Sequence, residues 1–127
     1  MNEADRTTLF GKYSRSKFSK TFAFEAKICK GNAIPFSSVK DHQENSLYCV
    51  KHGSFFHKLA DSGNQMPLDG VFLNREDAFV VIFWYRKRAD TSTTLIDIDV
   101  WLEEKEKSKR KSLTFTRACE IGNLINL

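Results

Sequence analysis

The sequence contains little of what marks several common classes of protein. Its 3 cysteines, Cys29, Cys49 and Cys119, are odd in number and form no Cys-x-x-Cys pair, so we expect buried reduced thiols, with neither a disulfide framework nor a structural zinc site. No stretch approaches the roughly 20 apolar residues of a membrane span. The N-terminal residues MNEADRTT hold no apolar signal segment, and we therefore expect an intracellular, cytoplasmic protein.

Several catalytic signatures are also missing. The chain has no Gly-rich phosphate loop, no Rossmann fingerprint, no nucleophile elbow and no internal repeat. The 127 residues do include 41% hydrophobic residues and 11 Phe, which suffice for one domain with a packed core.

Positive charge is clustered in two blocks, although the net charge is only +4. Basic patches on a small domain favour polyanionic partners, through phosphate contacts and counterion release. We expect the first block to bind nucleic acid; the second, which is mixed with glutamates, is explained equally well as a solvated segment. The first block is Lys12, Arg15, Lys17 and Lys20, and the second is Lys105, Lys107, Lys109, Arg110 and Lys111.

Hydrophobic patterns predict a mixed sheet flanked by about three helices, in the α/β or α+β class. Residues 78–85, AFVVIFWY, are almost entirely apolar, which is typical of a central strand covered on both faces. Turn residues and periodicity predict the remaining elements. We expect a helix over 2–13, a strand over 21–28, a helix from Ser37 or Ser38 to Gly53, an irregular connection over 54–70, a short strand over 71–73, a strand over 94–102, a charged connection over 103–111, and a last helix capped by Thr114 or Thr116 and ended by Gly122.

The most informative stretch is 22–43, FAFEAKICKGNAIPFSSVKDHQ. Side chains on a strand alternate between its faces, so Glu25 and Lys27 share one face and the apolar side chains beside them share the other. A carboxylate and an ammonium then lie side by side on an apolar strand. That arrangement suits metal-assisted hydrolysis of a phosphodiester, which needs oxygen ligands for a hard cation and a positive charge beside the scissile phosphate.

Gln43 falls on the inner side of the helix that follows. Val39, Gln43, Leu47 and Val50 recur with a helical period, which places an amide within an apolar stripe. A buried amide needs a hydrogen-bond partner, either backbone or a phosphate or water near Glu25.

A second pair of acids, Asp97 and Asp99, also shares a face of its predicted strand. The pair resembles two metal ligands, but we favour the simpler explanation of a half-exposed strand face.

The motifs in this stretch resemble the core of the PD-(D/E)XK nuclease superfamily, and more narrowly RecU-type Holliday junction resolvases and their phage relatives. In those proteins a strand with Glu-x-Lys leads to Pro-Phe and then to a helix with His-Gln. Later pieces of this chain extend the resemblance over most of its length. The matching residues are Glu25, Lys27, Pro35, Phe36, His42 and Gln43, followed by HKLAD, PLDGVFL, AFVVI, LIDID and KSLT.

The resemblance implies one restriction-endonuclease-like domain over residues 1–127. It implies a Mg²⁺-dependent endodeoxyribonuclease, with Mn²⁺ as a substitute metal, that nicks four-way DNA junctions symmetrically as a homodimer. The implied catalytic residues are Glu25, Lys27, Asp69 and Gln43; the implied metal ligands are Asp69, Glu25, the Ala26 carbonyl and Glu3; and the implied DNA contacts are Lys12, Arg15, Lys17, Lys20 and Lys30.

The position of the second metal-binding acid remains open. Asp5 precedes Glu25, as is usual in the family, but lies on a predicted helix. Asp69 follows Glu25, which requires a permuted order, yet it precedes a strand and resembles the family's Pro-Phe-Asp segment. We favour Asp69, because a strand end positions a ligand more rigidly than a terminal helix does.

Two further functions remain as alternatives: a related nuclease that cuts flaps or duplex DNA, and a catalytically silent module that only binds DNA. Aromatic residues offer a dimer surface, although we expect most of them in the core. These are Phe55, Phe56 and Phe72.

Overall fold

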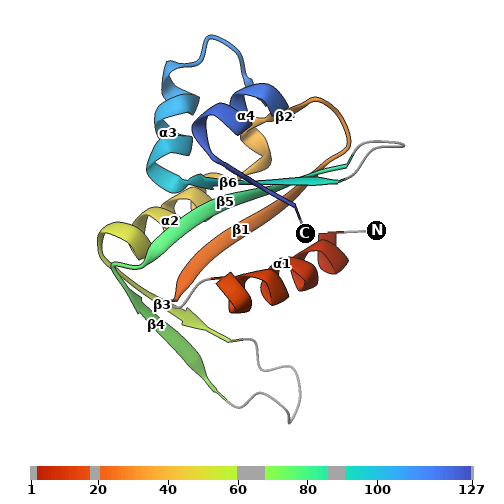
Figure 1. Cartoon of the computed structure of the whole chain (residues 1–127). Helices are drawn as coiled ribbons and strands as arrows, with labels where there is room; N and C mark the ends of the chain where they lie inside the picture. The colour runs from red at the N-terminus through yellow and green to blue at the C-terminus, as the bar shows by residue number, and fades with distance from the viewer. Residues whose placement is uncertain (1–2, 18–20, 60–67, 86–90, 127) are drawn as a thin grey trace.

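The computed structural model describes residues 3–17, 21–59, 68–85 and 91–126. Their main sheet has 4 strands and lies between helix α1 on one face and helices α2, α3 and α4 on the other (Figure 1). This mixed sheet covered by helices confirms the α/β class. No helix in the described ranges is both long and apolar enough to cross a membrane.

The elements have the following bounds, in chain order. They are α1 (Glu3–Lys17), β1 (Phe22–Cys29), β2 (Ala33–Pro35), the 3-10 turn η1 (Phe36–Ser38), α2 (Asp41–His52), β3 (Ser54–Lys58), β4 (Gly70–Asn74), β5 (Asp77–Trp84), β6 (Ser92–Asp97), α3 (Ile98–Lys107), β7 (Ser112–Thr114), α4 (Phe115–Ile121) and β8 (Asn123–Ile125).

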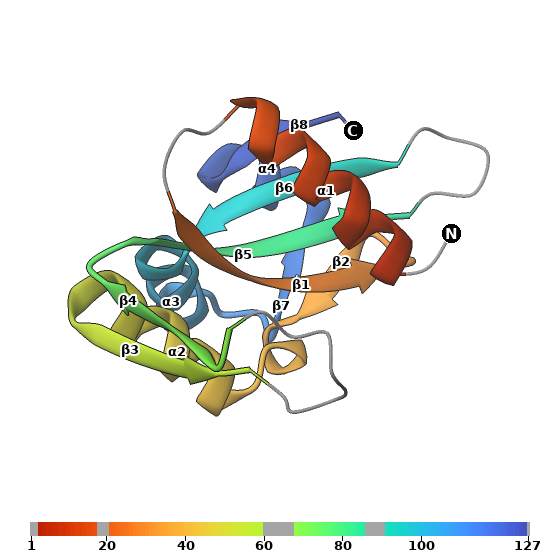
Figure 2. The ribbon, with the colours of Figure 1, turned by 90° about the horizontal axis from the view of Figure 1, so that it is seen from below.

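The strand order in the main sheet is β1-β5-β6-β8. β1 and β5 are parallel, while β6 is antiparallel to both of its neighbours. The connection from β1 to β5 contains α2 and the antiparallel hairpin β3–β4, which lies beside α2 (Figure 2). β1 is therefore an edge strand of the main sheet, with α2 and the hairpin near it.

β5 is the central strand, as its apolar sequence predicted. Val80 and Ile82 belong to the core cluster that includes Leu47 of α2, whereas Val81 belongs to the cluster around Phe10 of α1. Because strand side chains alternate, a strand buried on both faces must be apolar at nearly every position.

The predicted strand over 94–102 was wrong in its second half, because α3 begins at Ile98. Asp97 ends β6 and caps α3: its side chain accepts a hydrogen bond from the backbone N–H of Asp99, at 2.9 Å. Ile98 and Trp101 are both buried, three positions apart on the helix. The apolar residues of this segment fit both the period of two of a strand and the period of a helix. The cap that Asp97 provides favours the helix.

Other boundaries also moved. The first helix extends to Lys17, and α2 begins only at Asp41, after η1. The connection expected over 54–70 contains strand β3 and the first residue of β4, and a further short strand, β8, follows the last helix. The expected stops at Gly53 and Gly122 and the cap at Thr114 are confirmed.

The cysteines match the prediction only in part. All three are free thiols, and Cys29 is buried. Cys49 is exposed, because it lies on the outer side of α2, and Cys119 is only half-buried, so the expectation of three buried thiols was wrong for both.

Candidate functional site

Glu25 and Lys27 lie together on the α2 side of β1. Their partners across the parallel pair are Val80 and Ile82, which face α2. Lys27 Nζ lies 3.2 Å from Glu25 Oε1, and the two side chains keep 22% and 30% of their exposure. The face predicted from strand alternation is confirmed, and it presents a partly shielded carboxylate and ammonium.

Gln43 reaches this pair from the first turn of α2. Its Nε2 donates to Glu25 Oε1 at 3.0 Å, and its Oε1 accepts the backbone N–H of Lys40 at 2.9 Å. A carboxylate can only accept and an N–H can only donate, so the two bonds fix the orientation of the amide. Gln43 thus caps α2 and positions Glu25 at the same time.

A cavity of about 450 Å³ opens beside this triad, between β1, α2 and the hairpin β3–β4. Glu25 and Gln43 contribute polar groups to its wall, and His42 and His57 add two imidazoles. Lys27 does not line the cavity. Its remaining lining is Thr21, Phe22, Ala23, Phe24, Ser46, Leu47, Val50, Phe55, Val71 and Leu73.

Asp69 directly precedes β4, the second strand of the hairpin. His57 pairs with Val71 across β3 and β4, and both line the cavity. The pairing continues one step further, because the Leu59 N–H donates to the Asp69 carbonyl at 3.0 Å. The chain bends at Asp69, before β4 begins, so strand alternation does not fix the side on which its carboxylate lies. Asp69 itself is exposed and does not line the cavity.

Glu3 and Asp5 do not accompany Glu25. Both are exposed residues of α1, which packs through Phe10 against the opposite face of the sheet. The orientation of β1 explains the separation: Ala26 faces α1, while Glu25 faces α2. The predicted roles of Glu3 as a metal ligand, and of Asp5 as the alternative, disagree with this placement.

Glu25 is the one acidic residue among the described residues that line the cavity. In the described ranges no hydrogen bond reaches Glu25 Oε2, so one carboxylate oxygen is available. Within the same ranges no group of three or more His, Cys, Asp or Glu side chains is arranged to hold a metal ion. Mg²⁺ is usually held by one or two carboxylates and keeps several waters.

The predicted DNA-binding residues are divided by the fold. Lys12 is exposed on α1, on the far side of the sheet from Gln43, and Lys30 is exposed in the turn after β1. Lys20 and the side chains of Arg15 and Lys17 lie outside the described part of the chain. The exposed lysine and arginine side chains that the structure describes on the α2 side of the sheet were not among these predicted DNA contacts.

The acidic pair Asp97 and Asp99 forms a closed ionic cluster with the end of α2. Lys51 Nζ lies 2.8 Å from Asp97 Oδ1 and 2.7 Å from Asp99 Oδ2, and His52 Nε2 donates to Asp99 Oδ1 at 2.8 Å. Partial burial alone would raise the pKa of Asp99, but the hydrogen bonds from Lys51 and His52 outweigh it and hold that pKa below its usual value. Burial alone would lower the pKa of Lys51, but the hydrogen bonds and charges of Asp97 and Asp99 outweigh it and raise that pKa above its usual value.

Sequence reasoning missed a buried carboxylate, Glu44. It is 5% exposed, accepts the indole N–H of Trp101 at 2.7 Å and pairs with Lys105 Nζ at 2.9 Å. Its partners lie on α3, far along the chain, so no local pattern marks it. Sequence reasoning also gave no role to His42 and His57 in the cavity wall; the alternation of residues 55 and 57 was the available signal for His57.

Comparison of the chain with protein-family models, curated proteins and solved structures finds no match.

Proposed function

We propose that the chain is a Mg²⁺-dependent, structure-selective DNA endonuclease of the junction-resolving kind. The observation that carries the proposal is the meeting of Glu25, Lys27 and Gln43 beside a cavity whose wall includes Glu25 and Gln43. These residues come from an edge strand and from the first turn of a helix. They give the carboxylate a fixed orientation and place a cation beside it, as phosphodiester hydrolysis requires.

Each side chain has a role that its contacts support. Glu25, with Asp69, would hold Mg²⁺, which supplies Lewis acidity and an activated water when it is bound. Lys27 places a positive charge where negative charge develops on the phosphate. Gln43 is a positioning residue, because its amide fixes Glu25 Oε1 through bonds of 3.0 and 2.9 Å. Symmetric nicking of a four-way junction requires a two-fold homodimer.

An exposed aromatic pair is available for such an interface. Phe56 and Phe72 face each other across β3 and β4, on the side of the hairpin away from the cavity, and are 61% and 66% exposed. The expectation that they pack in the core was wrong. Phe55, on the other side of the hairpin, lines the cavity and is half-buried.

The deciding experiment compares a synthetic four-way junction with flap and plain duplex DNA, with Mg²⁺ and with EDTA. Wild type, Glu25→Ala and the exposed control Glu106→Ala are tested together. We expect paired symmetric nicks on the junction only, made with Mg²⁺ by wild type and by the control.

Three other outcomes would contradict this proposal. Equal cutting of all three DNAs would identify a general nuclease. Binding without any cutting would identify a silent DNA-binding module. Full activity of Glu25→Ala would show that Glu25 does not belong to the active site.

A further inference from the structure

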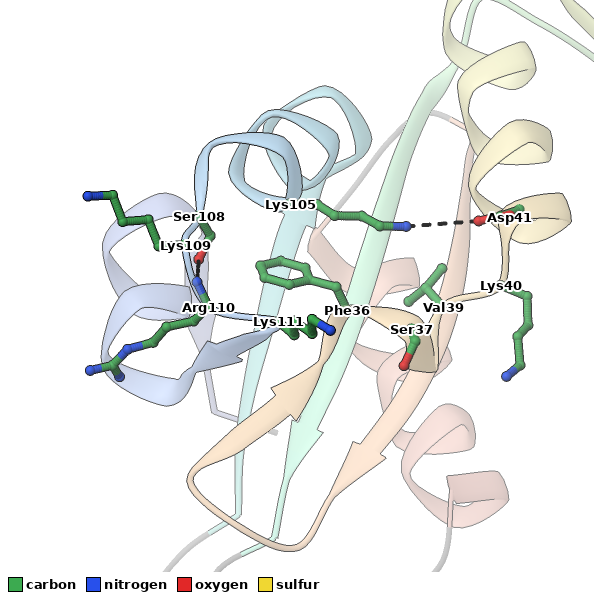
Figure 3. A pocket seen from close by; sticks show the side chains of 10 residues that line it. All are labelled: Phe36, Ser37, Val39, Lys40, Asp41, Lys105, Ser108, Lys109, Arg110 and Lys111. Carbon is green, nitrogen blue, oxygen red and sulfur yellow. Dashed lines mark hydrogen bonds and ion pairs between the residues drawn. The ribbon is translucent and has the colours of Figure 1, made fainter.

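A basic pocket adjoins the residues just before α2 and the first residue of that helix. Its volume is about 640 Å³, and it lies between residues 36–41 and the connection from α3 to β7 (Figure 3). Figure 3 shows Lys105 reaching across it toward Asp41, with Lys109 and Arg110 extending outward from the connection. The lining residues are Phe36, Ser37, Val39, Lys40, Asp41, Lys105, Ser108, Lys109, Arg110 and Lys111.

The charge in this pocket is positive and largely uncompensated. Lys105 is neutralised by buried Glu44 at 2.9 Å, and Asp41 is 95% exposed and 3.9 Å from Lys105. The other four cations, all exposed, make no ion pair with any described residue. They are Lys40, Lys109, Arg110 and Lys111. Like charges gathered around a cavity favour an anion with several charges.

The form of the pocket favours a phosphate backbone over a base. Phe36, the one aromatic residue in its lining, is only 4% exposed and packs edge-on against Trp101, with ring centroids 5.2 Å apart. No aromatic face of the lining is free for stacking, which is the usual way that unpaired bases are held. Flexible cations around an open pocket suit a duplex, which carries one negative charge per about 1.7 Å of its axis.

The pocket is joined to the Glu25 site through a single turn of backbone. Lys40 and Asp41 line the basic pocket, while His42 and Gln43, the next two residues, line the Glu25 cavity. The Lys40 N–H also donates to Gln43 at 2.9 Å, and Gln43 in turn holds Glu25. One DNA backbone passing the start of α2 would meet both cavities.

We infer that this basic pocket binds backbone phosphates of the DNA whose scissile phosphate lies at Glu25. The inference rests on the proposed function and adds a second contact surface to it. The main DNA contact would then lie on the α2 side of the sheet, and not on α1 as the sequence predicted.

The test measures binding of a labelled four-way junction in EDTA, where Mg²⁺-dependent cutting cannot interfere. Lys40→Gln/Lys111→Gln removes a charge from each wall of the pocket. Lys58→Gln/Lys107→Gln removes the same charge from exposed positions outside both cavities. Lys105 is left intact, because its loss would strand the buried charge of Glu44. Thermal unfolding of both variants checks that each of them is folded.

We expect the pocket variant to bind at least about tenfold more weakly, and its slope of log K against log salt to fall by about 1 to 2, since each phosphate contact contributes about 0.9. The control should stay within about threefold of wild type, with an unchanged slope. Equal losses in both variants, or no loss in either, would overturn the inference.

Two additional arms separate the remaining possibilities. Inorganic phosphate and dAMP test for a small-molecule anion site. If the pocket variant loses these ligands but binds the junction like wild type, the inference is wrong. If the pocket variant loses the junction while wild-type protein with Mg²⁺ never cuts it, the inference stands and the proposed nuclease function fails. Absence of DNA binding by wild type overturns both.

Discussion

The two acidic clusters of this protein, around Glu25 and around Asp97 and Asp99, resemble each other in sequence and differ in the fold. At the Asp97 cluster, Lys51, His52 and a backbone N–H together engage all four carboxylate oxygens. At Glu25, Lys27 and Gln43 both engage Oε1, and Oε2 faces no described partner. The first cluster is closed by ion pairs and the second retains an available oxygen beside a cavity.

The comparison shows that the spacing of acidic residues in a sequence predicts a metal site less well than the groups that surround their carboxylates in the fold. Asp-x-Asp offers more carboxylates for a metal than Glu-x-Lys does, yet here it caps α3 and ties that helix to the end of α2. Such a network stabilises structure and leaves no ligand position free. Glu25 is the better candidate, because its neighbours orient it without saturating it.

The largest difference that we expect between the two clusters is in the rate of the proposed reaction. We expect Glu25→Gln to lower the rate of junction nicking by about 10²-fold or more, as loss of a preorganised charged group does. Asp99→Asn should change the same rate by less than about threefold, since its cluster lies outside the cavity. Single-turnover nicking measures both. Similar losses in the two variants would erase the distinction.

Gln43 tests whether positioning matters at the open cluster. Gln43→Ala should reduce nicking by about 10- to 100-fold, the usual effect of losing a group that orients a metal ligand. Gln43→Glu places a second carboxylate beside Glu25, so the pH dependence of nicking should move to higher pH. A pH profile that coincides with that of wild type would show that the amide does not act through Glu25.

Asp97 tests the structural role of the closed cluster. Asp97→Ala removes the cap of α3 and a partner of Lys51, and should lower the free energy of unfolding by about 1 kcal/mol, within the 0.5–2 kcal/mol typical of such caps. Urea unfolding gives the value, and nicking should be retained at temperatures where the variant is folded. Unchanged stability would exclude the capping role.

The smallest effect concerns acid stability. The folded pKa of Asp99 lies below its ordinary value of 3.8, so its contribution is complete above that value and is lost as the pH falls through the lowered pKa. Asp99→Asn should therefore lower stability slightly at neutral pH and flatten its decline below about pH 4. Asp99 is 37% exposed, and solvent screening keeps the difference small. Thermal unfolding between pH 2 and 7 measures it.

Much of the candidate site follows from local periodicity. Strand alternation predicted the shared face of Glu25 and Lys27, and the helical period predicted the inward position of Gln43. The end of β6 could not be predicted in this way, because the side chains after Ile96 fit a strand and a helix equally well. The burial of Glu44 and the basic pocket could not be predicted for another reason. Both depend on tertiary contacts between α2, α3 and the segment after α3, which no local pattern in the sequence reveals.

The register of the hairpin β3–β4 also limits which insertions and deletions this chain would tolerate. Gly70 separates Asp69 from Val71, and a Cβ atom there would lie 2.7 Å from the Phe56 ring and 2.9 Å from the His57 carbonyl. Because alternation has a period of two, one residue inserted into β4 before Val71 would shift the pairing with β3 by one position and turn Val71 and Leu73 away from the cavity that they line. Gly70 is therefore a position where neither a side chain nor an extra residue fits without a shift of the hairpin.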